Sequence, residues 1–265
     1  MNAFKINTAV LALISSALLL AGCTDSKQDS KIRDFDHLNG KKIVVQEGTI
    51  FAETLAKDYP TYDVTTVPTF FGIYKALVSG TAEYGIDEDV SASLILSGGL
   101  SIDTSFTTIP AVPMGAVFNK NNQELKQQFD EFLTSLEQSG QLAEIRNKWV
   151  TCITPSSLPV PKAHSTEGEP LRAVIEADYP PFNLKNGNDV SGLDAELLTL
   201  FADYVKRPVE LSIVPFHELI PAVEEGKADI SISGISITEE RANKVLFSKP
   251  YNNTHIVIVS LKKDE

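Results

Sequence analysis

The stretch Ala222-Val-Glu-Glu-Gly-Lys-Ala-Asp-Ile-Ser-Ile232 carries the features that decide the fold class. It predicts the end of a helix, a glycine cap at Gly226 and a strand that begins with an acid. Residues 76–86 repeat the same pattern as Ala76-Leu-Val-Ser-Gly-Thr-Ala-Glu-Tyr-Gly-Ile86. The repeat predicts that the chain forms two similar lobes.

Strands and helices predicted from hydrophobic periodicity and turn residues alternate along the chain. The predicted strands cover residues 42–45, 63–67, 84–86, 172–175, 209–214, 229–233 and 256–260. The predicted helices cover residues 50–58, 71–78, 123–139, 142–149, 194–205 and 217–225. Alternation at this spacing indicates an α/β fold in which helices cover sheets.

Two polar stretches separate the ordered segments. The polar composition of residues 23–37 predicts a tether. Residues 151–170 contain four prolines and no apolar periodicity, which predicts a linker. The ordered segments are therefore residues 38–150 and 171–265, which are long enough for one large or two small cores.

The N-terminus has the pattern of an export signal. Lys5 is the only charge in the first 24 residues, and the apolar stretch Ala9–Ala21 is too short to span a bilayer comfortably. The stretch ends in Leu20-Ala-Gly-Cys23, which resembles the bacterial lipobox. We expect residues 1–22 to be a lipoprotein signal peptide and lipid on Cys23 to anchor the protein on the periplasmic side of the cell envelope. A plain secretory signal with an unrelated cysteine is the alternative.

Composition and charge argue against several other functions. The net charge of −12 argues against binding to nucleic acid. Only Cys23 and Cys152 are present, so no disulfide framework or thiol-rich metal site is expected. The four histidines show no ligand spacing. We therefore expect neither a metal nor another cofactor.

The two ordered segments carry motifs in a fixed order. Those of the second segment are Asp178-Tyr-Pro-Pro-Phe182, Gly192-Leu-Asp194, Phe216-His-Glu-Leu-Ile-Pro221, Ser233-Gly-Ile-Ser-Ile-Thr-Glu-Glu-Arg241 and Phe247-Ser-Lys-Pro-Tyr251. This series resembles the first half of bacterial solute-binding proteins of the polar amino-acid type, family 3. The first segment contains Leu38-Asn-Gly-Lys-Lys-Ile-Val-Val-Gln-Glu-Gly-Thr49, Ala76-Leu-Val-Ser-Gly80, Asn119-Lys-Asn-Asn122 and Lys148-Trp149. It resembles the second half. The resemblance implies a two-lobed class II periplasmic binding protein (Venus-flytrap) fold.

The halves stand in the reverse of the family's order. A circular permutation explains this with one complete domain, because the exposed ends of one lobe tolerate rejoining through the linker. We expect residues 38–113 to form the family's middle lobe, lobe 2. Residues 114–150 are expected to be the return hinge strand and two helices that pack on lobe 1, and residues 171–265 lobe 1 and a severed crossover strand. The tether would then attach at the hinge side, and residues 114–118 would be the remaining covalent link. A truncated pair of tandem domains is the alternative.

The resemblance assigns residues to the carboxylate of a bound amino acid. Arg241 matches the family's carboxylate-clamping arginine, whose guanidinium presents a fork of donors. The amide of Ser236, together with Thr49 and the amide of Ile50, would add donors, and a helix begins after Thr49. From spacing alone, Arg241 would be an ordinary ion pair with Glu239 or Glu240.

Other positions match residues for the ammonium and the side chain of the ligand. The carbonyl of Gly234, the hydroxyl of Ser236 and a carboxylate at Glu88, where the family usually has aspartate, would accept from the ammonium. The remaining expected ligand-binding residues are Tyr179 and Phe216, as aromatic walls, and Glu176, Asp87 and Gln46. Core packing is the alternative for the two rings. The acids favour a cationic ligand, a basic amino acid or a similar metabolite.

We therefore predict a monomeric binding protein that captures an amino acid by lobe closure and delivers it to an ABC permease. The sequence has no Gly-x-Ser-x-Gly motif and no histidine placed to pair with Cys152, so we do not expect an enzyme. A ligand-sensing subunit for a membrane partner is one alternative. A dehydratase on the same fold, with Glu88 as general acid, is another.

Overall fold

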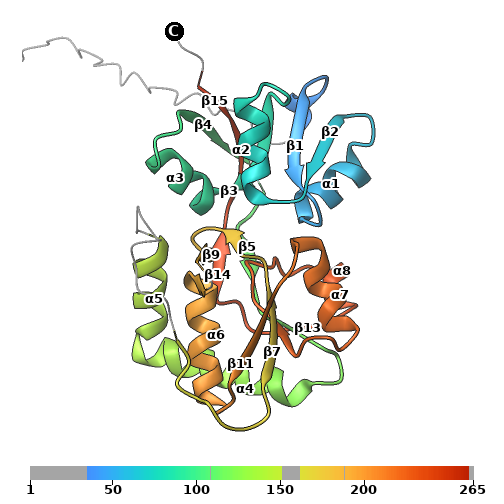
Figure 1. Cartoon of the computed structure of the whole chain (residues 1–265). Coiled ribbons are helices and arrows are strands. Elements are labelled where there is room, and N and C mark those ends of the chain that lie inside the picture. Colours follow the sequence, from blue (N-terminus) through green and yellow to red (C-terminus); the bar gives the residue numbers. More distant parts are fainter. Residues whose placement is uncertain (1–34, 108, 151–161, 188, 263–265) are drawn as a thin grey trace, which may run out of the picture. The chain divides into compact units, whose positions relative to one another are not determined.

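The computed structural model describes residues 35–107, 109–150, 162–187 and 189–262, which belong to one compact unit, Lys31–Glu265 (Figure 1). Two five-stranded sheets with helices against them form two lobes, as the repeat predicts. Among the described residues, no helix has the length and apolar character needed to cross a membrane. The expected signal peptide, Cys23 and most of the tether lie outside these residues.

The first sheet belongs to lobe 2. Its strand order is β2 (Asp63–Val67), β1 (Lys42–Gln46), β3 (Tyr84–Glu88), β15 (Ile256–Leu261) and β4 (Ile102–Phe106). The first three strands run parallel, and β15 runs antiparallel to both of its neighbours. The helices of this lobe are α1 (Ile50–Asp58), α2 (Phe70–Val78) and α3 (Asp89–Ser97). The last strands of the chain therefore complete the sheet that the first strands begin.

The second sheet belongs to lobe 1 and has the same arrangement. Its strand order is β11 (Val209–Ile213), β7 (Leu171–Ile175), β12 (Ile230–Ser231), β6 (Val117–Phe118) and β13 (Leu246–Phe247). Three parallel strands again stand next to an antiparallel strand that comes from a distant part of the chain. The helices are α6 (Leu193–Tyr204), α7 (Leu219–Glu224) and α8 (Glu239–Ala242), and α4 (Gln123–Ser139) and α5 (Gln141–Val150) pack on α6. A separate antiparallel sheet contains β8 (Asp178–Tyr179), β9 (Asn183–Asn186) and β10 (Asp189–Ser191).

Local sequence explains the elements that position the site. Thr49 caps α1 by accepting from the amide of Ala52 at 3.3 Å. In α4, apolar residues recur every three or four positions and are buried, among them Phe129 and Phe132. Gly140 ends that helix with φ +80°, a conformation that favours glycine.

Two strands carry the chain between the lobes. The strands β5 (Val112–Met114) and β14 (Asn252–Thr254) pair antiparallel, and they lead directly into β6 and β15. Because β14 leads into β15, residues 114–118 are one of two covalent links and not the only one, and the expectation of a severed crossing was wrong. The chain ends after β15 has entered the sheet of lobe 2.

The expected attachment of the tether at the hinge side was also wrong. The short 3-10 helix Phe35–Leu38 precedes β1, and the carbonyl of Asp36 accepts from the hydroxyl of Tyr62, next to the start of β2. The hinge lies at the opposite end of the sheet, where Ile256 pairs with Glu88, the last residue of β3. Phe35 is already buried, so the fold begins a few residues earlier than the predicted boundary at residue 38.

Most predicted elements agree with the structure to within a few residues. The predicted helix 217–225 is a 3-10 turn, Phe216–Glu218, followed by α7, and the predicted strand 229–233 contains only β12. Neither α3 nor β4 was predicted from the sequence. The apolar residues of α3 are not confined to one face of the helix, and only Ser91 and Ala92 in it are buried. The helix therefore lacks the periodic pattern on which the sequence prediction depends.

Candidate functional site

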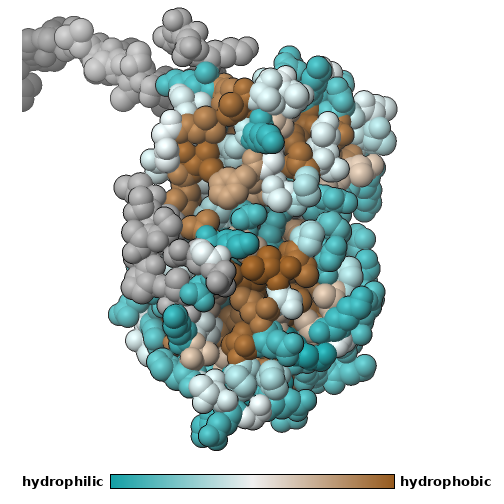
Figure 2. All heavy atoms as spheres, in the orientation of Figure 1, coloured by the Kyte–Doolittle hydropathy of each residue, from teal (hydrophilic) through white to brown (hydrophobic). Residues whose placement is uncertain are grey.

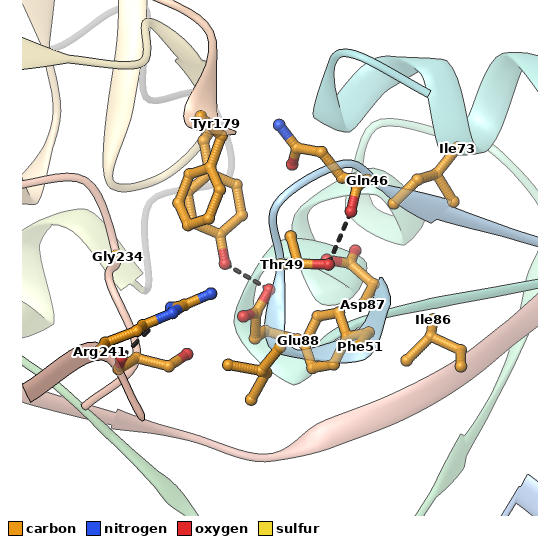
Figure 3. Close-up of a pocket in the computed structure, with 13 residues that line it drawn as sticks. Gln46, Thr49, Phe51, Ile73, Ile86, Asp87, Glu88, Tyr179, Gly234 and Arg241 are labelled. Atoms are coloured by element: carbon orange, nitrogen blue, oxygen red, sulfur yellow. Dashed lines mark hydrogen bonds between the residues drawn. The ribbon is translucent and has the colours of Figure 1, made fainter. Parts of the chain in front are cut away.

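A cavity lies between residues of the two lobes, at the C-terminal ends of the parallel strands (Figure 3). Its volume is about 20 Å³, room for about one water molecule. Ten of the eleven residues predicted to bind a ligand line it: Gln46, Thr49, Ile50, Asp87, Glu88, Tyr179, Phe216, Gly234, Ser236 and Arg241. The eleventh, Glu176, contacts Gln46 in the wall of the cavity. The structure therefore brings the whole predicted set together.

Arg241 is the buried cation of this site, with a side chain that is 5% exposed. Its Nη1 donates to the carbonyl of Ser236 at 3.3 Å, and its Nη2 donates to the carbonyl of Gly48 at 2.8 Å across the cleft. Nη2 also lies 3.3 Å from Oε1 of Glu53, which is half exposed. Nε has no hydrogen-bond partner among the described residues. The alternative of an ion pair with Glu239 or Glu240 is not formed among the described residues, and Arg241 points into the cleft (Figure 3).

Two neighbouring acids end β3 on the opposite wall. The hydroxyl of Tyr74 donates to Oδ2 of Asp87 at 2.5 Å, and the hydroxyl of Tyr179 donates to Glu88 across the cleft (Figure 3). Burial raises the pKa of Asp87 from 3.8 to about 7, although the bond from Tyr74 opposes the shift. Burial and the charge of Asp87 raise the pKa of Glu88 well above its usual value. The site therefore holds two carboxyls whose charged forms lack a cation.

Glu176 is a third buried carboxyl, at the end of β7. Nε2 of Gln46 donates to its Oε1 at 2.5 Å, which joins the two lobes. Its Oε2 has no partner among the described residues. Burial raises the pKa of Glu176 from 4.5 to about 7, and the bond from Gln46 opposes the shift.

The turn after β12 presents backbone groups to the cavity. Gly234 has φ +58°, and a Cβ there would lie 2.5 Å from Cε1 of Tyr179. Only glycine fits this close approach. The amide of Gly234 is already used, because it donates to Oδ2 of the buried Asp194 at 2.7 Å. Gly234 therefore borders the cavity with its amide occupied, while its carbonyl belongs to the next peptide group.

The two predicted aromatic residues have different surroundings. Tyr179 is buried and stacks on Phe182 with ring centroids 4.9 Å apart. Phe216 lies below the guanidinium of Arg241, with Cζ 5.9 Å from the ring centroid, a cation–π contact. Phe216 therefore packs against the ligand-site cation, while Tyr179 is both a core residue and a donor to Glu88.

Sequence reasoning missed several residues that shape the site. Phe51, Ile73 and Ile86 line the cavity as an apolar wall. Tyr74 is the partner of Asp87, and its position three to four residues from Phe70 and Leu77 on the buried face of α2 is the signal that could have found it. Glu53 could have been found from its place one turn after Thr49, at the start of α1.

The arrangement has the chemistry of a binding site. Among the described residues no group of three or more His, Cys, Asp or Glu side chains could hold a metal ion. The walls offer a guanidinium, two carboxyls, the backbone of Gly234 and aromatic faces, and the carboxyl of Glu176 lies behind Gln46. Groups of both charges can hold a small zwitterion or cation.

The fold and the site define a two-lobed periplasmic binding protein, as the motifs predicted. The chain belongs to the bacterial extracellular solute-binding proteins, family 3, whose sequence pattern matches residues 16–151 and 171–265. The match is broken within the predicted linker. The resemblance seen in the motifs is thereby confirmed, and the circular permutation stays a prediction.

Individual relatives match over a smaller part of the chain. The arginine-binding extracellular protein ArtP of Bacillus subtilis (strain 168) is 38% identical over 88 residues, which are 33% of this chain and 34% of the relative. A probable histidine-binding protein of Neisseria gonorrhoeae is 34% identical over 94 residues, 35% of each chain. A solved structure of an ancestral arginine-binding protein bound to arginine has 36% identity and a TM-score of 0.28, covering 30% of this chain and 35% of that one. The chain thus spans about a third of the length of these curated relatives.

Proposed function

We propose that this protein binds a cationic amino acid between its lobes. The observation that carries the proposal is a pair of buried, unpartnered atoms, one on the cation that lines the cavity and one on an acid that contacts its wall. Nε of Arg241 has a proton to donate, and Oε2 of Glu176 can accept one, and neither has a partner among the described residues. Burying such groups without partners costs free energy, which a ligand with a carboxylate and a cation would offset.

The remaining groups fit the ammonium of the same ligand. Glu88 lies between Arg241 and Gln46 in Figure 3, and the carbonyl of Gly234 borders the same cavity. Glutamate in place of the family's usual aspartate reaches further from β3, and here it extends to the hydroxyl of Tyr179. A cation that displaced this hydroxyl would compensate the charge on Glu88 and Asp87, whose raised pKa values reflect the lack of one.

The names of the relatives support the same class of ligand. Several of those matched by sequence are described as binding arginine or histidine, and both are basic amino acids. Three acids around one site favour a cation on electrostatic grounds as well. Isothermal titration calorimetry against arginine, lysine, ornithine, histidine, glutamine and glutamate tests the proposal. We expect one of the basic ligands to bind most tightly, and a preference for glutamate would overturn it.

We further propose that lipid on Cys23 anchors the protein at the cell envelope and that it delivers its ligand to an ABC permease. The lipobox-like end of the N-terminal apolar stretch supports the anchor. Binding by a two-lobed protein shifts the population from open to closed lobes, which a membrane partner can recognise. Mass spectrometry of the membrane-extracted protein, with and without Cys23→Ser, tests the lipid.

We also propose that the chain is a circular permutation of the family fold. Each sheet has three parallel strands, then an antiparallel strand, then an edge strand. In lobe 2 the antiparallel strand beside the parallel ones is the C-terminal β15. The end of β15 pairs with the start of β4, at the same end of the sheet at which β1 begins. A short peptide that joins residue 262 to residue 38, in a chain opened within 151–161, would restore the family order. We expect this variant to be monomeric and to bind the same ligand with similar affinity, and an aggregating product would contradict the proposal.

A further inference from the structure

The helix α3 starts beside the ligand site without contributing to its walls. Glu88 lines the cavity and is followed directly by Asp89, the first residue of α3, but neither Asp89 nor Ser91 borders the cavity. Only two residues of this helix are buried. Its apolar side chains reach the surface, where Leu96 is 49% exposed, and Figure 2 shows hydrophobic surface over this part of lobe 2. We therefore expect the polar contacts of residues 89–91, which we call the α3 turn, to hold the helix in place.

Asp89 fastens the α3 turn to one of the two strands that connect the lobes. Its Oδ1 accepts from the hydroxyl of Thr254 at 3.0 Å and from the amide of His255 at 3.1 Å. Its amide donates to the carbonyl of His255 at 2.9 Å. Thr254 is buried and ends β14. Because these bonds hold consecutive residues, β14 is fixed to lobe 2 at Thr254, and rotation between the lobes has to occur on the lobe 1 side of that residue.

Ser91 connects the α3 turn to lobe 1. Its buried hydroxyl donates to the carbonyl of Pro180 at 3.0 Å. Pro180 follows Tyr179, whose hydroxyl donates to Glu88 and also interacts with Ser91. Separating the lobes would break the bond between Ser91 and Pro180, so this bond belongs to the closed arrangement.

The bond of Ser91 differs from the other hydrogen bonds that cross the cleft among the described residues. Each of those has a predicted ligand-binding residue as its donor, and they run from Gln46 to Glu176, from Tyr179 to Glu88, and from Arg241 to Gly48 and Glu53. A ligand competes with them, since an ammonium at Glu88 would replace the hydroxyl of Tyr179. The bond from Ser91 to Pro180 uses no predicted ligand-binding residue, so it can persist while the ligand is bound.

We propose that the α3 turn couples ligand binding at Glu88 to closure of the lobes. Asp89 holds the end of β3 on the hinge strand β14, and Ser91 holds lobe 1 once the ligand has taken the place of Tyr179. Both are positioning residues, because neither borders the cavity. The inference rests on the proposed function, since the coupled ligand is the one proposed to bind in the cleft. It goes beyond that function by assigning residues that set how long the ligand stays bound.

Stopped-flow kinetics with L-arginine as the probe tests the role of Ser91. In Ser91→Ala we expect koff to rise about fivefold to tenfold and kon to stay within about twofold. The bond to Pro180 forms after the ligand has entered the cleft, so its loss acts on dissociation. Ser97→Ala removes a hydroxyl from the other end of the same helix and should leave both rates unchanged. Equal changes in Ser91→Ala and Ser97→Ala would overturn the inference and leave the proposed function standing.

Two substitutions of Asp89 separate its bonds from its charge. Asp89→Ala removes both and should weaken binding of L-arginine about tenfold. Asp89→Asn keeps an oxygen that can accept from Thr254 and His255, so its affinity should stay within about threefold of that of the unmodified protein. An equal loss in the two variants would show that Asp89 acts through its charge, and would contradict its role at the hinge.

Small-angle X-ray scattering of the ligand-free protein gives a measurement that does not depend on the probe. We expect Ser91→Ala and Asp89→Ala to increase the radius of gyration, because fewer molecules have closed lobes, and Ser97→Ala to leave it unchanged. Unchanged radii in both variants of the α3 turn would overturn the inference. If L-arginine failed to bind the unmodified protein, the proposed function would be overturned, and the scattering would decide the inference by itself.

Discussion

The third parallel strand of each lobe begins in the same way and ends differently. At the start of β3 the amide of Glu83 donates to Lys42, whose amide donates back to the Glu83 carboxylate. Asp229 and Arg172 make the same two bonds at the start of β12. Four and five residues further on, lobe 2 has Asp87 and Glu88, and lobe 1 has Ser233 and Gly234.

We infer from this difference that one scaffold can serve the two ends of a ligand. Buried carboxyls at the end of β3 suit an ammonium or another cation, while the turn after β12 offers a backbone carbonyl and leads to Arg241. Residues that hold the sheet together are repeated, because both sheets need the same register. Residues at the cleft diverge, and we expect the two strand ends to contact different groups of the ligand.

Removing Arg241, the cation of lobe 1, should have the largest effect on ligand binding. In Arg241→Ala we expect binding of a basic amino acid to fall about a hundredfold or more, because a buried charge pair is lost. Calorimetry measures the loss. Arg207→Ala, which removes an arginine paired with Asp229 away from the cleft, should change affinity by less than about twofold. Retained affinity in Arg241→Ala would mean that lobe 1 does not hold the carboxyl end.

Removing the charge of Glu88, at the end of β3 in lobe 2, should have a smaller effect on ligand binding. Glu88→Gln keeps the size of the side chain and removes its charge, so we expect basic ligands to bind about tenfold to thirtyfold more weakly. A neutral ligand such as glutamine should lose less. Glu83→Gln, at the start of the same strand, is the control, and an equal loss there would indicate a structural effect.

The acids also predict opposite pH dependences for stability and for binding. Asp87 and Glu176 have folded pKa values of about 7, above their usual values, so the ligand-free protein gains stability from them at low pH and loses it as pH rises through about 7. We expect Tm of the ligand-free protein to fall by roughly 5–10 °C from pH 5 to pH 8. Affinity for a basic ligand should rise over the same range, severalfold, because the ionised carboxyls attract it.

Scanning calorimetry and titration calorimetry at matched ionic strength measure the two trends. The double variant Asp87→Asn/Glu176→Gln should reduce both slopes, since amides do not titrate in this range. If affinity for the basic ligand fell as pH rose from 5 to 8, these acids would not be the groups that face its cation.

The repeat 76–86 and 222–232 was enough to predict the two lobes, because helix caps and acid-led strands are local signals. The set of site residues followed from the family motifs, and spacing alone would have left Arg241 as a surface ion pair. The pairing of Tyr179 with Glu88 could not be predicted, since it joins residues 91 positions apart across the cleft. The place of β15 between β3 and β4, which corrected the view of the hinge, likewise depends on long-range pairing.

The smallest expected effect concerns Glu53, an acid of lobe 2 that contacts Arg241 of lobe 1. Glu53 is 45% exposed and lies 3.3 Å from Nη2 of Arg241, so its attraction to the arginine is weakened by solvent. In Glu53→Gln the guanidinium loses a competing anion, and we expect free arginine to bind about twofold to fivefold more tightly. Glu47→Gln is the matched control, because Glu47 is similarly exposed on lobe 2 but lies near His217. An equal gain in Glu47→Gln would show that the loss of any surface charge on lobe 2 raises the affinity, and that Glu53 does not act on the carboxyl end of the ligand.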